Sequence, residues 1–174
     1  MAPTSSSANG RDQENDAHVA LIATFYAAFA EGDAETMVAC YHPDVVFADP
    51  GFGQLRGDDA KNMWRMLCRS AKDLVVATTD IAAADGRGQA HWEADYTFST
   101  GRKVHNVIDA EFDFAEGLII RHTDTFDFAR WSGQAFGLPG QLIGRVPVIP
   151  QAAFQQVARR QLASYSASRQ AKSV

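Results

Sequence analysis

Apolar residues recur at helical spacing through the first third of the chain. Between a capping Asp16 and Gly32, one helical face carries Val19, Ile22, Phe25, Tyr26 and Phe29. A second short helix is predicted over 33–41, and a third over 57–69, each with an inward apolar stripe. Pro43 ends the second helix, because proline disfavours helix in the residue before it.

From residue 73 the apolar period changes from 3.6 to 2, which indicates β-strands. Four long strands are predicted: Leu74–Ala84, Gln89–Ser99, Lys103–Ala115 and Leu118–Phe128. Short glycine-containing turns separate them, so successive strands pair antiparallel. A shorter strand over 45–48 leads into Asp49. Helices followed by a sheet predict an α+β fold, with the helices packed on one face of a curved antiparallel sheet.

Three regions are predicted along the chain. Residues 1–16 form a disordered tail without the apolar centre of a secretory signal. Residues 17–131 form the folded domain. Residues 132–174 form a C-terminal extension that is punctuated by glycine and proline and ends in a helix over 151–165. Its apolar content predicts that it covers the core or a dimer partner.

The charge is distributed unevenly. The net charge is −5, but residues 1–129 hold 10 basic and 21 acidic side chains, whereas residues 130–174 hold 6 basic and none acidic. Six charges spread over this segment with few aromatics are a weak nucleic-acid footprint, so the tail is expected to dock against an acidic body. Because one sheet face is apolar, we expect that body to belong to a homodimer.

Composition and motifs narrow the chemistry. No apolar run approaches the roughly 18 residues that a membrane span needs, so no membrane partner is expected. Cys40 and Cys68 lie in apolar patterns, which favours reduced structural thiols and a cytoplasmic location. The chain has no CxxC, HExxH, P-loop or GxGxxG motif, so no metal, nucleotide or redox cofactor is expected.

The last predicted strand carries ionisable side chains through an apolar setting. Alternation places His122 and Asp124 on one face, between Ile120 and Phe126. Such a pair is more typical of a partly buried pocket than of a solvent-exposed surface. A buried structural role remains open for both residues, hydrogen-bonded or paired with each other.

Hairpin geometry predicts which carboxylates meet. With a two-residue loop at Glu116-Gly117, Asp109 lies opposite Asp124 and Glu111 opposite His122, which gives a coupled acid pair in an apolar cavity. The earlier hairpin is open. A three-residue loop at Thr100–Arg102 adds His91 and Glu93 to this face, whereas a two-residue loop places Trp92 and Ala94 there. The first is preferred, since it gathers the charges and leaves an apolar face of Trp92, Ala94, Ile108, Ala110 and Phe112.

Several stretches carry a family resemblance. The segments are FYAAF with EGD over residues 25–33, VFADP over 46–50 and IRHTDTFD over 120–127. The order of elements and these stretches resemble the NTF2-like superfamily, the cone-shaped fold of ketosteroid isomerase, limonene epoxide hydrolase and SnoaL-type polyketide cyclases. The likeness covers roughly residues 17–131. It implies a pocket floored by the sheet and roofed by the first helices.

The resemblance assigns roles residue by residue. Asp49 falls at the proton-shuttling carboxylate of the isomerase, and Asp109 at its protonated oxyanion-hole Asp, a case of pKa tuning known for that enzyme. Asp124 resembles the catalytic acid of the cyclases. The oxyanion tyrosine aligns with Phe25, which argues against steroid-type isomerisation. The Arg-x-Asp pair of the epoxide hydrolase corresponds to His91-Trp92-Glu93, which argues against epoxide opening.

Together these features predict a SnoaL-like enzyme without a cofactor. It would perform acid–base cyclisation, isomerisation or hydration on a hydrophobic, carbonyl-bearing small molecule. Asp124 is the expected main acid or base, with His122, Asp49 and Asp109 assisting. The predicted pocket-lining residues are Phe25, Tyr26, Trp64 and Phe126. The alternatives are that Asp49 caps a turn and that the chain is a non-catalytic ligand-binding or dimerisation module.

Overall fold

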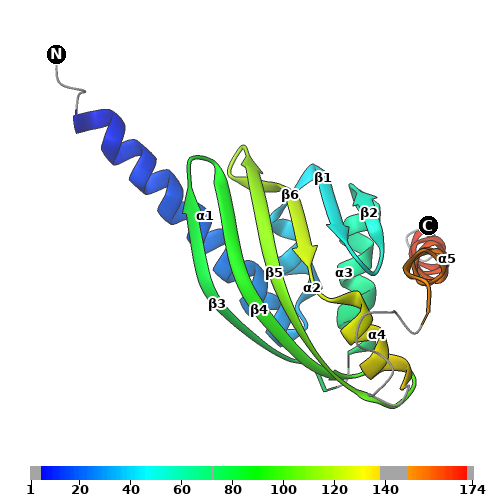
Figure 1. Cartoon of the computed structure of the whole chain (residues 1–174). Coiled ribbons are helices and arrows are strands. Elements are labelled where there is room, and N and C mark those ends of the chain that lie inside the picture. Colours follow the sequence, from blue (N-terminus) through cyan, green and yellow to red (C-terminus); the bar gives the residue numbers. More distant parts are fainter. Residues whose placement is uncertain (1–4, 72, 138–148, 172–174) are drawn as a thin grey trace.

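The chain folds as helices packed on a curved six-stranded sheet (Figure 1). The structure is a computed structural model and describes residues 5–71, 73–137 and 149–171. The helices are α1 (Ser5–Glu31), α2 (Ala34–Ala39), α3 (Asp58–Ser70), α4 (Phe128–Phe136) and α5 (Gln151–Gln170). The strands are β1 (Tyr41–Asp49), β2 (Gly53–Arg56), β3 (Val75–Ala84), β4 (Arg87–Thr97), β5 (Lys103–Ala115) and β6 (Leu118–Thr125). The α+β class and the NTF2-like cone predicted from the sequence are confirmed.

The sheet has the strand order β2-β1-β6-β5-β4-β3. Strands β3 to β6 form the antiparallel meander that the sequence predicted. Strand β1 joins this meander alongside β6 in parallel, and β2 pairs antiparallel with β1 at the edge. The sheet is therefore mixed. The parallel pairing is possible because a long connection, which contains α3 and the rest of the meander, joins β1 to β6.

Helices α1, α2 and α3 lie on one side of the sheet (Figure 1). The sheet face beneath them carries the predicted apolar set, Trp92, Ala94, Ile108, Ala110 and Phe112, all buried. From α1, Phe25, Tyr26 and Phe29 pack into the same core. The homodimer prediction relied on an uncovered apolar face, and that reasoning was wrong, because the helices of the same chain cover it.

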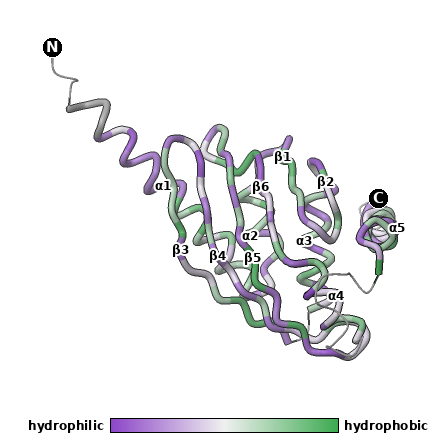
Figure 2. The backbone as a smooth tube through the Cα atoms, viewed as in Figure 1, coloured by the Kyte–Doolittle hydropathy of each residue, from purple (hydrophilic) through white to green (hydrophobic). Residues whose placement is uncertain are grey.

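Helix α1 begins earlier than the sequence predicted. It extends back to Ser5, whereas a disordered tail was expected to residue 16. The N-terminal turns of α1 are hydrophilic (Figure 2) and project away from the sheet (Figure 1). Residues 9–17 are largely exposed, so burial does not account for this part of the helix.

The segment after α1 differs from the prediction at one residue that matters for the site. Asp33 caps α2 as expected, its side chain accepting from Thr36 N at 3.1 Å. The helix ends at Ala39, however, and Tyr41 is the first residue of β1. Strand pairing with Ile119 of β6 replaces the last helical turn that was predicted there.

The C-terminal part of the fold contains two helices. Strand β6 ends at Thr125, and Asp127 caps α4 by accepting from Arg130 N at 2.9 Å. Helix α5 lies beside β2 and α3 (Figure 1). Arg169 of α5 pairs with Glu35 at 3.6 Å, so the basic tail meets the acidic body within one chain. Residues 138–148 of the predicted covering segment lie outside the described residues.

No described helix combines the length and the apolar character that a membrane crossing requires.

Candidate active site

Strand β6 carries His122 and Asp124 into the interior between sheet and helices. His122 is fully buried and Asp124 is 5% exposed, whereas the intervening Thr123 is only partly buried and Arg121 is exposed. The predicted alternation on this strand is confirmed. Both groups therefore sit where an unpaired charge would be costly, and their hydrogen bonds decide what they can do.

The register between β5 and β6 differs from the prediction. The Glu116-Gly117 turn gives the expected pairs Ala115–Leu118 and Phe114–Ile119. The register then shifts, so that Ile120 has no partner and Ala110, not Asp109, lies opposite Asp124. Likewise Phe112, not Glu111, lies opposite His122. One bulged residue moves all later partners to the other face, so the predicted Asp109–Asp124 pair does not exist.

Asp109 instead lies on the outer face of the sheet. Its side chain is 80% exposed and accepts from His91 Nδ1 at 2.8 Å. The hydrogen bond that His91 donates to Asp109 raises the pKa of His91. Glu93 lies 3.6 Å from the same imidazole, so these three residues share one face. That face is exposed, which places Asp109 away from His122 and Asp124. The prediction that His91 and Glu93 join the face of His122 and Asp124 was wrong, because Trp92 and Ala94 lie on that buried face instead.

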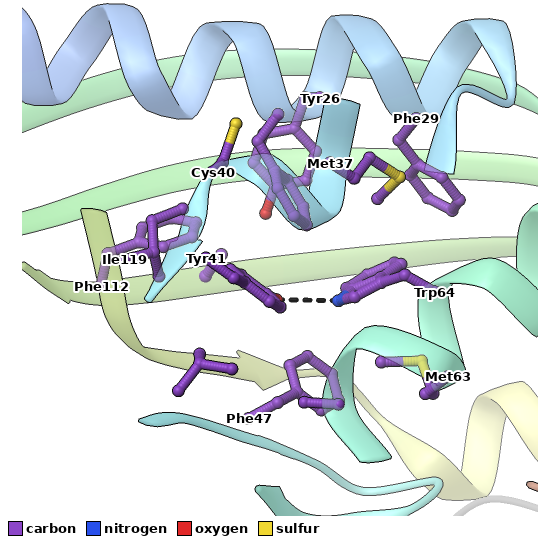
Figure 3. Packing of buried hydrophobic residues seen from close by; sticks show 14 of the residues in the cluster. Tyr26, Phe29, Met37, Cys40, Tyr41, Phe47, Met63, Trp64, Phe112 and Ile119 are labelled. Carbon is purple, nitrogen blue, oxygen red and sulfur yellow. Dashed lines mark hydrogen bonds between the residues drawn. The ribbon is translucent and has the colours of Figure 1, made fainter. Parts of the chain in front are cut away.

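A chain of hydrogen bonds, in which each group donates to the next, ends at Asp124. Trp64 Nε1 donates to the Tyr41 hydroxyl at 2.8 Å (Figure 3), and this hydroxyl lies 2.7 Å from His122 Nδ1. His122 Nε2 lies 2.9 Å from Asp124 Oδ1. Because Tyr41 accepts from the indole, its proton is free for Nδ1, and a neutral His122 then carries its own proton on Nε2 toward the carboxylate. Every donor is satisfied without a cation.

A second indole fixes the same carboxylate oxygen. Trp92 Nε1 donates to Asp124 Oδ1 at 3.3 Å. Both bonds to Asp124 thus reach Oδ1, and Oδ2 accepts none from any residue that the structure describes. The carboxylate is held at one oxygen, and the other remains available to a bound molecule.

Aromatic rings enclose the imidazole of His122. Trp64 stacks on it with a centroid separation of 5.9 Å, and Phe112 lies at 4.4 Å. Phe25 and Phe47 contact it edge-on at 5.4 and 5.2 Å. Of the predicted lining residues, Phe25, Tyr26 and Trp64 are therefore in the core around His122. Phe126 is only partly buried and lies near Trp131.

Tyr26 is the polar residue of this core without a partner. Its hydroxyl is buried and has no hydrogen bond within the described part of the chain. Burial raises its pKa well above the ordinary value, with a smaller contribution from the charge of Asp124. The phenol is therefore kept protonated in the neighbourhood of the carboxylate.

Asp49 stands at the end of β1, next to this network. Its Oδ1 accepts from Phe52 N at 2.5 Å, which closes the turn that was one of the readings of Asp49-Pro50. Burial raises the pKa of Asp49 to about 7, and the charge of Asp124 adds to the effect. Asp124 is thus coupled electrostatically to Asp49, and not to Asp109 as the hairpin prediction had it.

Tyr96 joins the group from β4. Trp131 Nε1 of α4 donates to its hydroxyl at 2.8 Å. Burial raises the pKa of Tyr96, and the charge of Asp49 contributes. Tyr96 is therefore hydrogen-bonded to α4 and also senses the charge of Asp49.

The space between sheet and helices is filled by side chains. Phe25, Phe47, Trp64 and Phe112 are each at most 2% exposed (Figure 3 shows the last three). The two hollows found among the described residues lie elsewhere, along the outer face of the sheet near His105 and near Arg121. These aromatic rings fill the interior around His122, so the deep apolar pocket predicted from the resemblance is not shown among the described residues.

The described residues contain no group of three or more histidine, cysteine or carboxylate side chains arranged to hold a metal ion. Cys40 and Cys68 are free, and burial raises the pKa of each thiol to about 11. Thiolate chemistry at neutral pH therefore has no basis at either cysteine.

Tyr41, Trp92 and Tyr96 are site residues that the sequence reasoning missed. Tyr41 was assigned to a helix, and Trp92 to a purely apolar face. A signal for Trp92 existed, because a buried indole N–H needs an acceptor and an Asp was expected nearby. Tyr41 gave no such signal, since its partner His122 is 81 residues away in sequence.

Solved structures share this fold. An LEH-like epoxide hydrolase from M. tuberculosis superposes with a TM-score of 0.58 and 18% identity, covering 71% of this chain and 92% of that chain. TerC, co-crystallised with polyporic acid, gives 0.61 and 18%, covering 70% and 99%. A protein from Jannaschia sp. CCS1, provisionally described as a SnoaL-like polyketide cyclase, gives 0.63 and 12%, covering 72% and 95%. At these identities the likeness shows the fold alone.

No curated protein sequence matched the chain. The profile of the SnoaL-like domain, in contrast, matches residues 22–122, which run from the second half of α1 to His122 in β6. This match covers more than half of the 174 residues. With its NTF2-like architecture, the chain belongs to the SnoaL-like domain family.

Proposed function

We propose that the chain is a small-molecule enzyme that performs cofactor-free acid–base chemistry on a hydrophobic, carbonyl-bearing substrate. The reaction would be a cyclisation, an isomerisation or a hydration. One observation carries the proposal: Asp124 is held at Oδ1 by His122 and Trp92, has no donor to Oδ2 among the described residues, and interacts with Asp49. Two carboxylates in different environments can divide the roles of base and acid.

The proposed roles follow from this arrangement. Asp124 acts as the base, removing a proton from the carbon next to the substrate carbonyl. Asp49, whose pKa lies at about 7, donates its proton to the carbonyl oxygen and thereby forms the enol. The reverse transfers regenerate both groups. His122 keeps Asp124 oriented through the chain that begins at Trp64.

Two of the similar structures support this substrate class as a proposal for this chain. TerC was crystallised with polyporic acid, and the Jannaschia protein is provisionally described as a polyketide cyclase. Epoxide hydrolysis gains less support. His91 and Glu93, which stand where the epoxide hydrolase pattern has Arg and Asp, lie on the outer face of the sheet.

A second candidate is a non-catalytic ligand-binding or dimerisation module. The observation that favours it is the close aromatic packing around His122, whose imidazole is fully buried and lies 4.4 Å from the ring of Phe112. In that case the Tyr41–His122–Asp124 chain has a structural role, as a satisfied buried polar network.

Exchange of the proton on the carbon next to the substrate carbonyl for deuterium distinguishes the enzyme from the non-catalytic module. The protein in D₂O is mixed with a panel of cyclic enones and aromatic polyketones, and loss of the α-proton signals is followed by ¹H NMR. The proposal expects exchange with the parent protein, none with Asp124→Asn, and unchanged exchange with the outer-face control Asp109→Asn. Saturation-transfer signals without exchange would support a binding module. Neither binding nor exchange across the panel would contradict both small-molecule roles and leave dimerisation.

We also propose a homodimer and a cytoplasmic location. The sheet face opposite the helices is open, contains both hollows and exposes Val75 at 64%. Two free thiols suit a reducing compartment. Light scattering after size exclusion tests the first, with a mass of 18.9 kDa contradicting the dimer. Fluorescence microscopy of a tagged chain in its native cell tests the second.

A further inference from the structure

Helix α5 binds the backbone of the turn that carries Asp49. Gln151 and Gln155 each donate from Nε2 to the carbonyl of Pro50, at 3.0 and 3.1 Å. Arg159 donates to two carbonyls further along the chain: Nε to the Phe52 carbonyl at 2.7 Å and Nη2 to the Gln54 carbonyl, in β2, at 3.1 Å. Three side chains of one helix, one turn apart, thus engage three carbonyls of one short segment.

Gly53 allows this approach. It has φ +69°, and a Cβ there would lie 2.8 Å from Arg159 Nη2. A side chain at this position would therefore be strained and would also displace the guanidinium. The turn combines a backbone conformation that glycine favours with the close contact that the forked Arg159 side chain requires.

Helix α5 also covers the carboxylate side of the turn. Phe154 Cε1 lies 3.7 Å from the place where a Cβ of Gly51 would stand, and Asp49 Oδ2 lies 3.3 Å from the same place. The Phe154 ring packs on Trp131 at 4.9 Å and on Phe128 at 5.7 Å, both from α4. The helix is thus fixed on one side by aromatic contacts and on the other by bonds to backbone carbonyls.

We propose that Arg159 is a positioning residue for Asp49, which fixes the 49–53 turn beneath α5 so that the carboxylate stays in its buried position. The inference rests on the proposed acid–base function of Asp49. It concerns a helix outside the 22–122 match to the SnoaL-like domain, so it is a property of this chain's C-terminal extension. Arg159 acts through the turn rather than on the substrate.

The consequence for Asp49 is electrostatic. Desolvation is the largest cause of its raised pKa, and the other titratable groups that interact with it are Asp124 on β6 and Tyr96 on β4. If α5 separates from the turn, water reaches the carboxylate and its charged form becomes less costly. The pKa of Asp49 then falls, and an acid matched to neutral pH is lost.

The test compares two neighbouring arginines of α5. Arg159→Ala removes both bonds to the turn, whereas Arg160→Ala changes an exposed side chain on the same helix and serves as the control. Asp49 is titrated by carboxyl-carbon NMR in each variant of the full chain. The proposal expects a fall of roughly one pH unit or more for Arg159→Ala and no shift for Arg160→Ala. Arg159→Lys, which keeps the charge but not the fork, should fall between them.

An unchanged Asp49 titration in a folded Arg159→Ala variant would overturn the proposal, as would equal shifts in both variants. If Arg159→Ala does not fold, hydrogen–deuterium exchange of the parent protein decides. Peptides covering 49–56 and 151–160 should then open with the same protection, and unequal protection contradicts the proposal. Both readouts need no substrate. Failure of the proposed function alone would instead appear as absent α-proton exchange, while the pKa of Asp49 still falls in Arg159→Ala and stays unchanged in Arg160→Ala.

Discussion

His122 Nε2 lies 2.9 Å from Asp124 Oδ1, two residues further along the same strand. Through Tyr41 this bond connects the carboxylate to the indole of Trp64, so that the orientation of Asp124 depends on a residue of α3. The chain is buried and every donor in it has an acceptor. Such a network restrains its members to one geometry, since breaking any bond leaves a polar group without water.

Replacing Asp124 by Asn separates its chemical role from its structural one. The Asn amide oxygen can still accept from His122 and Trp92, so stability near neutral pH should be unchanged or slightly raised. If Asp124 is the base, α-proton exchange should fall at least about 100-fold. The pKa of Asp49 should also fall, because the charge of Asp124 contributes to raising it after burial. Urea unfolding, α-proton exchange and carboxyl NMR measure the three effects; an active variant would remove Asp124 from the mechanism.

The two buried tyrosines should respond in opposite ways to loss of the hydroxyl. Tyr41→Phe leaves Trp64 Nε1 and His122 Nδ1 without partners, and should cost roughly 2–4 kcal/mol of unfolding free energy. Tyr26→Phe removes a hydroxyl that has no partner among the described residues, and should change stability by about 1 kcal/mol or less, toward greater stability. Urea denaturation at pH 7 measures both. Equal losses of unfolding free energy would show that the Tyr26 hydroxyl has a hydrogen-bond partner or that the Tyr41 hydrogen bonds contribute little to stability.

The sequence was most informative where periodicity and turn chemistry act locally. Alternation along β6 identified His122 and Asp124 as inward-facing, and the Glu116-Gly117 turn gave the first two pairs of the last hairpin correctly. Both follow from neighbouring residues alone. The class of fold followed in the same way, since helical spacing gives way to strand spacing near residue 73.

Beyond the bulge at Ile120, local patterns did not predict the strand register. The turn fixes only the pairs beside it, and one extra residue in β6 exchanges the faces of everything beyond. Nothing in the local pattern distinguishes Ile119 from Ile120 as the residue that packs inward. The same holds for Tyr41, whose strand forms by pairing with distant β6. Long-range packing, rather than local propensity, decided both positions.

Asp109→Asn tests the corrected register. The outer-face position predicts no effect on α-proton exchange and little change in stability, because the side chain is 80% exposed. The pKa of His91 should fall, since the hydrogen bond that His91 donates to Asp109 is the main cause of its elevation. Titration of the His91 ring signals by NMR, with His105 as an internal reference on the same face, measures the shift. A loss of activity together with an unmoved His91 would restore Asp109 to the site.

Asp49→Asn should change how stability depends on pH. The folded pKa of about 7 lies above the ordinary 3.8, so between these values the folded state binds more protons than the unfolded state. The free energy of unfolding then decreases as pH rises through this window and levels off above pH 7. Integrated over the shift, the effect has an upper bound of about 4 kcal/mol.

Asn has no proton to lose and imitates the protonated acid. The variant should therefore match the parent protein near pH 4 and exceed its stability increasingly up to pH 8. Urea unfolding of both proteins at pH 4.5, 6 and 8 measures the difference, which cancels the contributions of all other titrating groups. The Phe52 N–H keeps an acceptor in the Asn carbonyl, so the turn should survive the change. A difference that is flat with pH would mean that water already reaches the carboxylate, and Asp49 would then lack the environment that an acid at neutral pH requires.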